Sequence, residues 1–373
     1  MSERLGGEAA PGRDGVAHLR ALAATPRFAG SAEEAAARAY CARVLRDAGW
    51  DVSVTPFEYS ALPGRYGTPI GGAIAMATVL ATAALAALSR SPRLAAIVLA
   101  AGLLAVGLFA RRMLGDGVLD LPWLRRGGEN LVARRGPSAP RVWLVAHLDS
   151  KSQPVPSRTR VLGIALLALA IVLSVVAVGL TLATGSARTT LWTLGVALAV
   201  VGGGVVVAST VANASPGAVD NASGVAAVLA AAAELDPSAS VGVLLPSAEE
   251  LGLAGARAWV RAHTAERAFV LNCDGVDDQG ALTLMYTRDL PTPIADAVRR
   301  AAGDARVRRM PPGLLLDSVA FADAGWSAAT VSHGSLRTLA RVHTPLDSLD
   351  RLDGRAIAPV ARVLARAAEA LAR

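Results

Sequence analysis

The chain of 373 residues is poor in lysine, cysteine and aromatic side chains. Lys151 is its only lysine, so the formal net charge of +7 comes mainly from arginines, which are scattered rather than clustered. Aromatic residues make up 4% of the chain, too few for the stacking platforms on which nucleic-acid bases rest. We therefore expect no nucleic-acid partner. Two cysteines, Cys41 and Cys273, cannot form a disulfide scaffold, which favours a reducing compartment.

Charged residues are also scarce, at 18%, whereas hydrophobic residues reach 53%. This imbalance is concentrated in four uncharged segments, 66–89, 94–110, 161–187 and 189–219. A membrane-spanning helix needs about 20 apolar residues, and buried helices of soluble proteins rarely stay uncharged for so long. Short turns around 90–93 and 185–188 join the segments in pairs. The sequence thus predicts two transmembrane hairpins, 66–110 and 161–212, inserted into another domain.

The charges that flank these segments predict an orientation. Residues 1–14 are polar and lack the apolar core of a signal peptide. The side that holds both termini has eight basic residues near the helix ends, and the two turns have three, Arg90, Arg93 and Arg188. Basic residues prefer the cytoplasmic side of a membrane. We therefore expect a multi-pass protein of the cell membrane whose large domain faces the cytoplasm.

The remaining residues, 1–65, 111–160 and 213–373, alternate between strand-like and helical patterns. Strands are expected at 51–59, 141–147, 241–245, 268–273, 282–287 and 328–332. Helices are expected at 31–47, 221–235, 252–263, 292–302 and 354–372. Such alternation predicts an α/β domain with a mixed, largely parallel sheet covered by helices on both faces. Ligands of such sheets bind beyond the carboxyl ends of the strands.

Five polar clusters fall at or near those strand ends. They are Ala146-His-Leu-Asp-Ser150, Asp220-Asn-Ala-Ser-Gly224, Glu249-Glu-Leu-Gly-Leu-Ala-Gly255, Asn272-Cys-Asp274 and His343-Thr-Pro-Leu-Asp347. Each cluster alone has an ordinary structural explanation. Asp220, for example, has the position of a helix N-cap, and adjacent glutamates often begin a solvated helix. Their order along the chain is far more specific than any one of them.

Together these clusters resemble the M28 family of zinc metallopeptidases, which are aminopeptidase-like and use two zinc ions. That family has an A-H-x-D-S strand end, a D-N-x-S-G helix start, an E-E-x-G-x-x-G turn, a strand-end Asp and a late H-T-x-x-D. All five occur here in the same order, and Thr25–Ser31 is similar to the family's opening segment. Residues Leu316-Asp-Ser318 depart from the family's S-D-H triplet, because the histidine is missing.

The resemblance implies a role for each matching residue. His147 and Asp274 would hold one zinc ion, Glu250 and His343 the other, and Asp220 would bridge both. The resemblance further implies that Glu249 is the general base and that Asp149 supports His147. Histidine nitrogen and carboxylate oxygen suit zinc, whereas Mg²⁺ and Ca²⁺ prefer ligands that are all oxygen.

The sequence thus indicates a membrane-embedded dinuclear zinc aminopeptidase that hydrolyses peptides. A glutaminyl cyclase or a carboxypeptidase on the same fold is an alternative. A catalytically silent membrane scaffold is another, but the expected membrane helices contain no charged residue that would mark a transport path. The hairpins are then anchors in the lipid bilayer, or packing surfaces for a membrane partner or a second copy of the chain.

Overall fold

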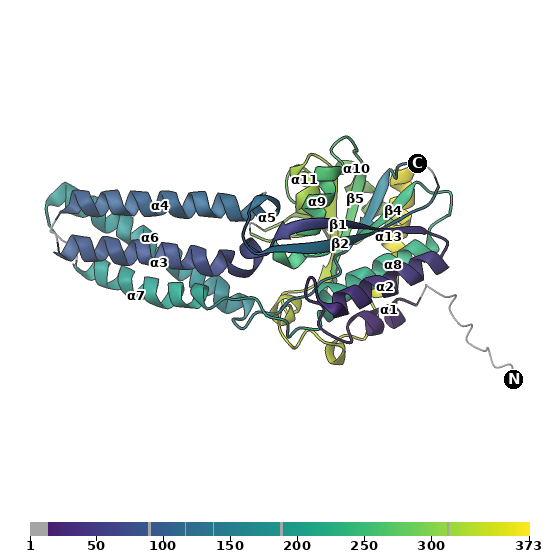
Figure 1. The fold of residues 1–373 in the computed structure, drawn as a ribbon, viewed down its shortest axis with the longest axis horizontal. Coiled ribbons are helices and arrows are strands. Elements are labelled where there is room, and N and C mark those ends of the chain that lie inside the picture. The colour runs from purple at the N-terminus through teal and green to yellow at the C-terminus, as the bar shows by residue number, and fades with distance from the viewer. Residues whose placement is uncertain (1–13, 89–90, 116, 137, 187–188, 312) are drawn as a thin grey trace. The chain divides into compact units, whose positions relative to one another are not determined.

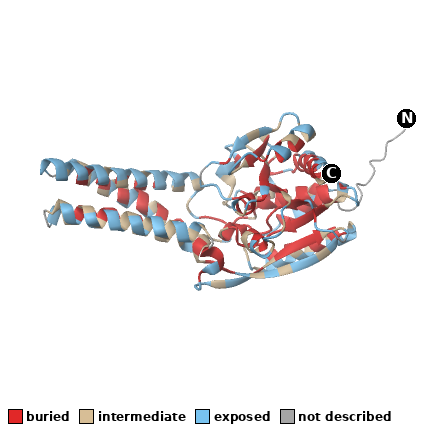
Figure 2. Cartoon of the chain, turned by 90° about the horizontal axis from the view of Figure 1, so that it is seen from above, coloured by how far each residue is buried: buried red, intermediate tan, exposed pale blue. Residues whose placement is uncertain are grey.

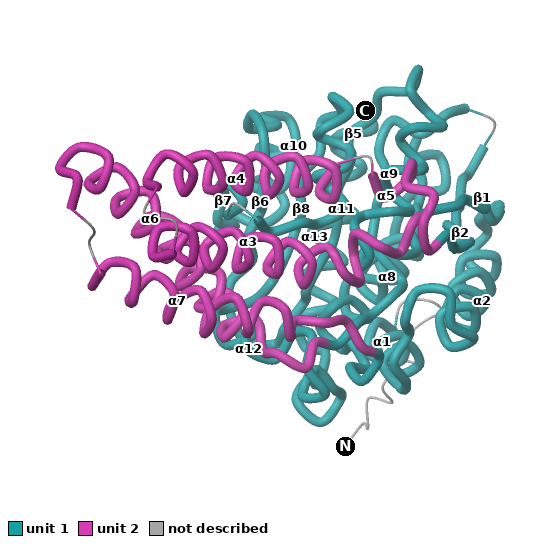
Figure 3. Tube along the Cα trace, turned by 60° about the vertical axis from the view of Figure 1, so that its left-hand side comes forward, with its two compact units in different colours: residues 1–59, 125–152, 213–373 teal, residues 60–124, 153–212 magenta. Residues whose placement is uncertain are grey.

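The computed structural model describes all residues except 1–13, 89–90, 116, 137, 187–188 and 312. The chain divides into two compact units, each formed by separate stretches of sequence (Figure 3). Unit 1 contains residues 1–59, 125–152 and 213–373, and unit 2 contains residues 60–124 and 153–212.

Unit 1 is built on an eight-stranded sheet with the strand order β1-β2-β4-β3-β5-β8-β6-β7. The strands are β1 (Asp51–Ser60), β2 (Arg125–Arg134), β3 (Val142–Val145), β4 (Val241–Leu245), β5 (Phe269–Val276), β6 (Ala281–Tyr286), β7 (Arg306–Arg309) and β8 (Ser327–Gly334). The central strands β4, β3, β5 and β8 run parallel, and β2 and β6 join them in the antiparallel direction. The predicted mixed, largely parallel sheet is thus confirmed.

Helices cover both faces of this sheet (Figure 1). Leu144 packs into one hydrophobic core with α1 (Gly15–Leu22), α2 (Ala32–Asp47), α8 (Gly224–Glu234), α10 (Thr292–Ala301) and α13 (Ile357–Ala372). Its neighbours Trp143 and Val145 pack into the opposite core with α9 (Ala254–Ala262) and α11 (Asp317–Asp323). The alternation follows from the two-residue period of a strand, so β3 is apolar on both faces. Figure 2 shows that the buried residues of unit 1 gather along the sheet and these helices.

Some elements of unit 1 differ from the sequence expectation. Strands β2 and β7 were not expected, because β2 begins with Arg-Arg-Gly-Gly and β7 reads Arg-Val-Arg-Arg, neither of which shows an apolar alternation. Helices α1 and α11 were missed because each is only one or two turns long. The helix expected at 221–235 begins at Gly224, since residues Ala218–Ser223 form a separate irregular turn.

Among its described residues, unit 2 contains four helices that are long and apolar enough to cross a membrane: α3 (Leu62–Leu88), α4 (Pro92–Leu114), α6 (Ser157–Thr184) and α7 (Thr189–Val207). A short helix, α5 (Gly117–Asp120), follows α4, and α12 (Thr338–Arg341) lies in unit 1.

Close approach of α6 and α7 depends on glycine. A Cβ atom added at Gly202 would lie 2.6 Å from the carbonyl oxygen of Gly163. Small residues serve the same purpose in membrane helices generally.

Candidate metal centre

The polar clusters of unit 1 meet at the carboxyl ends of the central strands. His147 follows β3, the two glutamates 249 and 250 form a 3₁₀ turn after β4, and Asp274 lies near the end of β5. Asp220 comes from the turn before α8, and His343 from the loop after α12. Because β3, β4 and β5 are parallel neighbours, their carboxyl ends lie at one edge of the sheet. Chain segments far apart in sequence thus supply one site.

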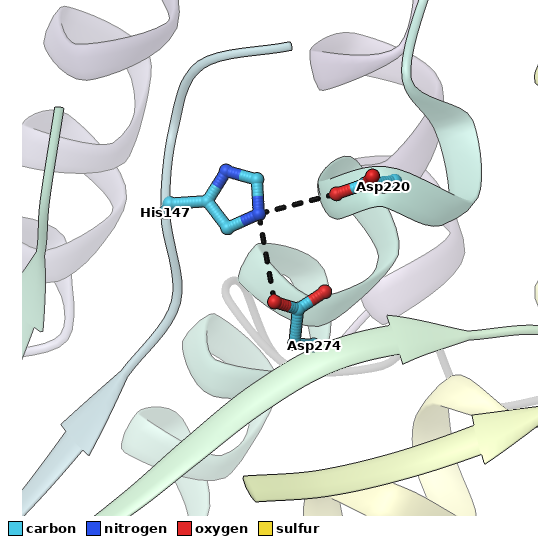
Figure 4. Close-up of side chains that lie close together, drawn as sticks. All are labelled: His147, Asp220 and Asp274. Carbon is cyan, nitrogen blue, oxygen red and sulfur yellow. Dashed lines mark ion pairs between the residues drawn. The ribbon is translucent and has the colours of Figure 1, made fainter. Parts of the chain in front are cut away.

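His147, Asp220 and Asp274 form the first group of candidate ligands (Figure 4). The Nε2 atom of His147 lies 3.2 Å from Oδ1 of Asp220 and 3.7 Å from Oδ2 of Asp274. The His147 side chain is 1% exposed, so this nitrogen is directed at the two carboxylates and away from bulk solvent. The three atoms are close enough to one another to hold a single metal ion.

Asp220, Glu250 and His343 form a second group that shares Asp220 with the first. The Nε2 atom of His343 lies 3.0 Å from Oδ2 of Asp220 and 3.2 Å from Oε1 of Glu250. Asp220 therefore presents one oxygen to each histidine, which is the geometry of a bridging carboxylate. His343 has a backbone φ of 65°, a conformation that residues other than glycine seldom adopt. Such local strain is often concentrated at functional sites.

Glu249 belongs to neither group, although it is the sequence neighbour of Glu250. Its Oε2 atom lies 4.0 Å from Nε2 of His147, and the side chain is 6% exposed. Burial raises the pKa of Glu249 well above its usual value, the charge of His147 opposes this, and the nearby carboxylates Glu250 and Asp317 raise it further. A carboxyl group that favours the protonated form is suited to accept and hold a proton.

Asp149 fixes the positions of both His147 and the two glutamates. The Nδ1–H group of His147 donates to the main-chain carbonyl of Asp149 at 3.0 Å, an assignment that follows because a carbonyl only accepts. The lone pair of His147 is then on Nε2, facing the carboxylates. The carboxylate of Asp149 accepts from the backbone N–H groups of Glu249 and Glu250, at 3.0 and 3.1 Å. Asp149 thus supports His147, as the resemblance implies, and also holds the turn of the two glutamates.

Asp347 holds the turn of Asp220 in the same way, a role that the sequence did not predict. Its two carboxylate oxygens accept from the backbone N–H groups of Val219 and Asp220, at 2.7 and 3.1 Å. The side chain of Asn221 donates to the carbonyl of Cys273 at 3.0 Å and accepts from Gly275 N–H at 3.2 Å. It thereby ties the Asp220 turn to both sides of Asp274. Both residues lie in the quoted motifs, but the motifs do not say what they contact.

Asp317 is a further acidic residue that was passed over because its triplet lacks a histidine. It lies at the start of α11, is fully buried, and neither carboxylate oxygen has a hydrogen-bond partner among the described residues. Burial raises the pKa of Asp317 to about 7; the charge of His147 lowers this pKa, and that of Asp149 raises it. Asp317 therefore adds to the negative potential around Glu249.

The donor set fits metal cations. Nε2 of His147, Oε1 of Glu250 and Oδ2 of Asp274 are buried without a hydrogen-bond partner among the described residues. Burial raises the pKa of Asp274 well above its usual value, and the charge of His147 opposes the shift. Burial acts the same way on Asp220, but its contacts with His147 and His343 outweigh this and hold its pKa well below the usual range. So many carboxylates require added positive charge to be ionised together, and two histidine nitrogens among them favour zinc.

Comparisons with known proteins agree with this geometry. Among solved structures, an aminopeptidase from Aneurinibacillus sp. strain AM-1 is similar at a TM-score of 0.55 and 16% identity, covering 95% of this chain and 92% of its own. A zinc aminopeptidase from Bacillus subtilis matches at 0.55 and 14%, covering 95% and 94%. A Bacteroides thetaiotaomicron glutaminyl cyclase bound to N-acetylhistamine also matches at 0.55 and 14%, covering 95% and 96%.

These similarities show the fold, and no curated protein sequence matches the chain significantly. The model of peptidase family M28 matches residues 130–368, more than half of the chain and nearly all of the candidate site's surroundings. The chain therefore belongs to peptidase family M28.

Proposed function

We propose that this protein is a membrane-embedded aminopeptidase with two zinc ions. The observation that carries the proposal is the pair of candidate ligand groups that share Asp220. His147 and Asp274 complete one metal position, and Glu250 and His343 complete the other. A zinc pair of this kind polarises a substrate carbonyl and lowers the pKa of water.

In this proposal Glu249 transfers the proton. Its carboxylate takes a proton from the attacking water and later delivers it to the nitrogen of the leaving amine. The raised pKa of Glu249 favours holding that proton between the two steps. Asp149 contributes by fixing the position of the glutamate turn relative to the His147 ring, since it accepts hydrogen bonds from both.

We further propose that the four helices of unit 2 span the cell membrane as two hairpins, 66–110 and 161–212. Residues 1–65, 111–160 and 213–373 then form one discontinuous peptidase domain. The excess of basic residues beside the helix ends supports a cytoplasmic location for that domain. Protease added to intact cells should leave the domain uncut, and cleavage within residues 213–373 would contradict this orientation.

The central test is the substitution Glu249→Gln in the full chain, purified in detergent. The amide keeps the size of the side chain but cannot take up a proton, so hydrolysis of N-terminal residues from a peptide panel should fall by roughly 10²- to 10⁴-fold. Zinc content, measured by elemental analysis, should stay at about two ions per chain in both proteins, because two metals are what such a site holds. The exposed Glu33→Gln is the matched control and should keep full activity. A Glu249→Gln protein with normal activity would rule out the mechanism.

Glutaminyl cyclase activity is the second candidate, because a solved cyclase matches the fold at the same TM-score, 0.55, as an aminopeptidase does. Peptides that begin with glutamine distinguish the two reactions. Cyclisation releases ammonia and leaves every residue in the product, whereas an aminopeptidase releases free glutamine. Peptides with a blocked N-terminus complete the panel, because only a carboxypeptidase would shorten them.

A further inference from the structure

The only lysine of the chain contacts one of the proposed metal ligands. The Nζ atom of Lys151 lies 2.6 Å from Oε2 of Glu250 and 3.4 Å from its main-chain carbonyl. The Lys151 side chain is 14% exposed and that of Glu250 is 4% exposed, so this ion pair is largely shielded from solvent.

The two oxygens of Glu250 consequently have different roles. Oε2 accepts from the ammonium group of Lys151, whereas Oε1 is buried without a hydrogen-bond partner among the residues that the structure describes and lies 3.2 Å from Nε2 of His343. Only Oε1 is then available to a metal ion. Asp274, in the other group, forms its ion pair with His147 among the described residues. The two metal positions therefore differ in the positive charge beside them.

The choice of lysine over arginine is informative in a chain whose other basic residues are arginines. An ammonium group is a compact charge that can bind one carboxylate oxygen and leave the second free. A guanidinium group is a planar fork that tends to bind both oxygens of a carboxylate. Arginine at position 151 would therefore compete with a metal ion for Oε1 of Glu250.

We propose that Lys151 makes the two metal positions unequal: it limits Glu250 to one ligand oxygen and, through its positive charge, weakens the position formed by Asp220, Glu250 and His343. The position formed by His147, Asp220 and Asp274 then fills first. This inference rests on the proposed dinuclear metal site and concerns how that site is loaded. Lys151 acts through Glu250, so it is a positioning residue.

The test is a zinc titration of the full chain in detergent after removal of metal with a chelator, followed by competition with a chromophoric chelator. The wild-type protein should bind zinc in two separable steps. Lys151→Met should strengthen the weaker step by about tenfold or more, because a like charge a few ångströms from the ion is removed. Lys151→Arg should weaken that step, and the stronger step should stay unchanged in both variants. Lys151→Gln repeats the charge removal with a polar side chain, in case methionine disturbs the packing.

Arg38→Met is the matched control, because Arg38 is 15% exposed and pairs with Glu129 away from the candidate ligands. It should change neither step. Opposite effects of methionine and arginine at position 151 support the inference, since a purely structural role would make both variants weaken binding. Two equal steps in the wild-type protein, or variants that shift in the same direction, would overturn the inference alone. Absence of zinc binding by the wild-type protein would overturn the proposed function as well.

Discussion

The two units of this chain use opposite means to build an interior. The interior of unit 1 contains charged residues such as Arg27 and Asp149, each bonded to several partners. Among the described residues, the polar side chains buried within the long helices of unit 2 are the hydroxyl groups of Thr78, Thr82 and Ser174, and each donates to the carbonyl four residues earlier in its own helix. The hydrogen bonds of Arg27 and Asp149 thus join different segments of unit 1, whereas those of the three hydroxyl groups in unit 2 stay within one helix.

The outer surfaces differ as well. The helices of unit 2 leave large apolar side chains such as Leu104, Val161 and Val201 exposed, each by about 60%. Its buried positions are filled largely by Gly, Ala and Val, so small size is what its helix contacts require. A substitution in unit 1 should therefore act through lost polar partners, and one in unit 2 through added volume. Three substitutions test this difference.

The largest effect is expected from Arg27→Met in unit 1. The Arg27 side chain is 2% exposed and donates to main-chain carbonyls on both sides of the site, among them Leu148, Pro216 and Gly217. Methionine removes the Arg27 donor from each of these carbonyls, of which that of Gly217 still accepts from the Ala222 N–H group, and the loss should cost about 4 kcal/mol of the free energy of unfolding. Chemical unfolding of the full chain in detergent measures it. The ion pair of Arg38 with Glu129, whose side chain is 47% exposed, is the control, and Arg38→Met should cost less than about 1 kcal/mol.

A smaller loss is expected from Gly202→Leu in unit 2. A Cβ atom at this position would approach the Gly163 carbonyl within 2.6 Å and Leu166 Cβ within 2.8 Å, so α6 and α7 must move apart. Overpacking of this kind costs about 3 kcal/mol. Gly204→Leu in the same helix is the control, because nothing lies within 4 Å of a Cβ there. Equal melting temperatures for the two variants would mean that close helix packing does not hold unit 2 together.

The smallest effect is a pH dependence caused by Glu34 in unit 1. Burial, and next the charge of Asp149, raise the pKa of Glu34 from 4.5 to about 7. The folded protein thus binds the Glu34 proton more tightly than the unfolded chain does. Ionisation therefore destabilises the fold progressively as the pH rises from 4.5 to about 7.

Glu34→Gln removes this ionisation. Between about pH 5 and about pH 7 the wild-type protein should lose about 2 kcal/mol of stability relative to the variant. Melting temperatures of both proteins at several pH values measure this difference. Glu33→Gln, on the exposed side of the same helix, should follow the wild-type curve. A constant difference between wild type and Glu34→Gln at all pH values would show that Glu34 has an ordinary pKa in the fold.

Much of the fold was predictable because its signals are local. The apolar segments predicted the four long helices, and alternating strand and helix patterns predicted the mixed sheet. Strand β7 was not predicted, because an edge strand that reads Arg-Val-Arg-Arg has no apolar alternation. The turn at Ala218–Ser223 was not predicted, because the side chain of Asn221 forms a hydrogen bond with strand β5, 52 residues further on, and not with its own helix. No local pattern contains that information.

The sequence by itself determined which residue types are available at each strand end, and their order identified the family. It did not determine that Asp220 presents one oxygen to each histidine, that Asp149 and Asp347 hold the two acidic turns through backbone N–H groups, or that Lys151 binds one oxygen of Glu250. Those contacts exist because parallel strands bring their carboxyl ends to one edge of the sheet. The residue types at each strand end are thus a property of the chain, whereas the direction of each side chain is a property of the fold.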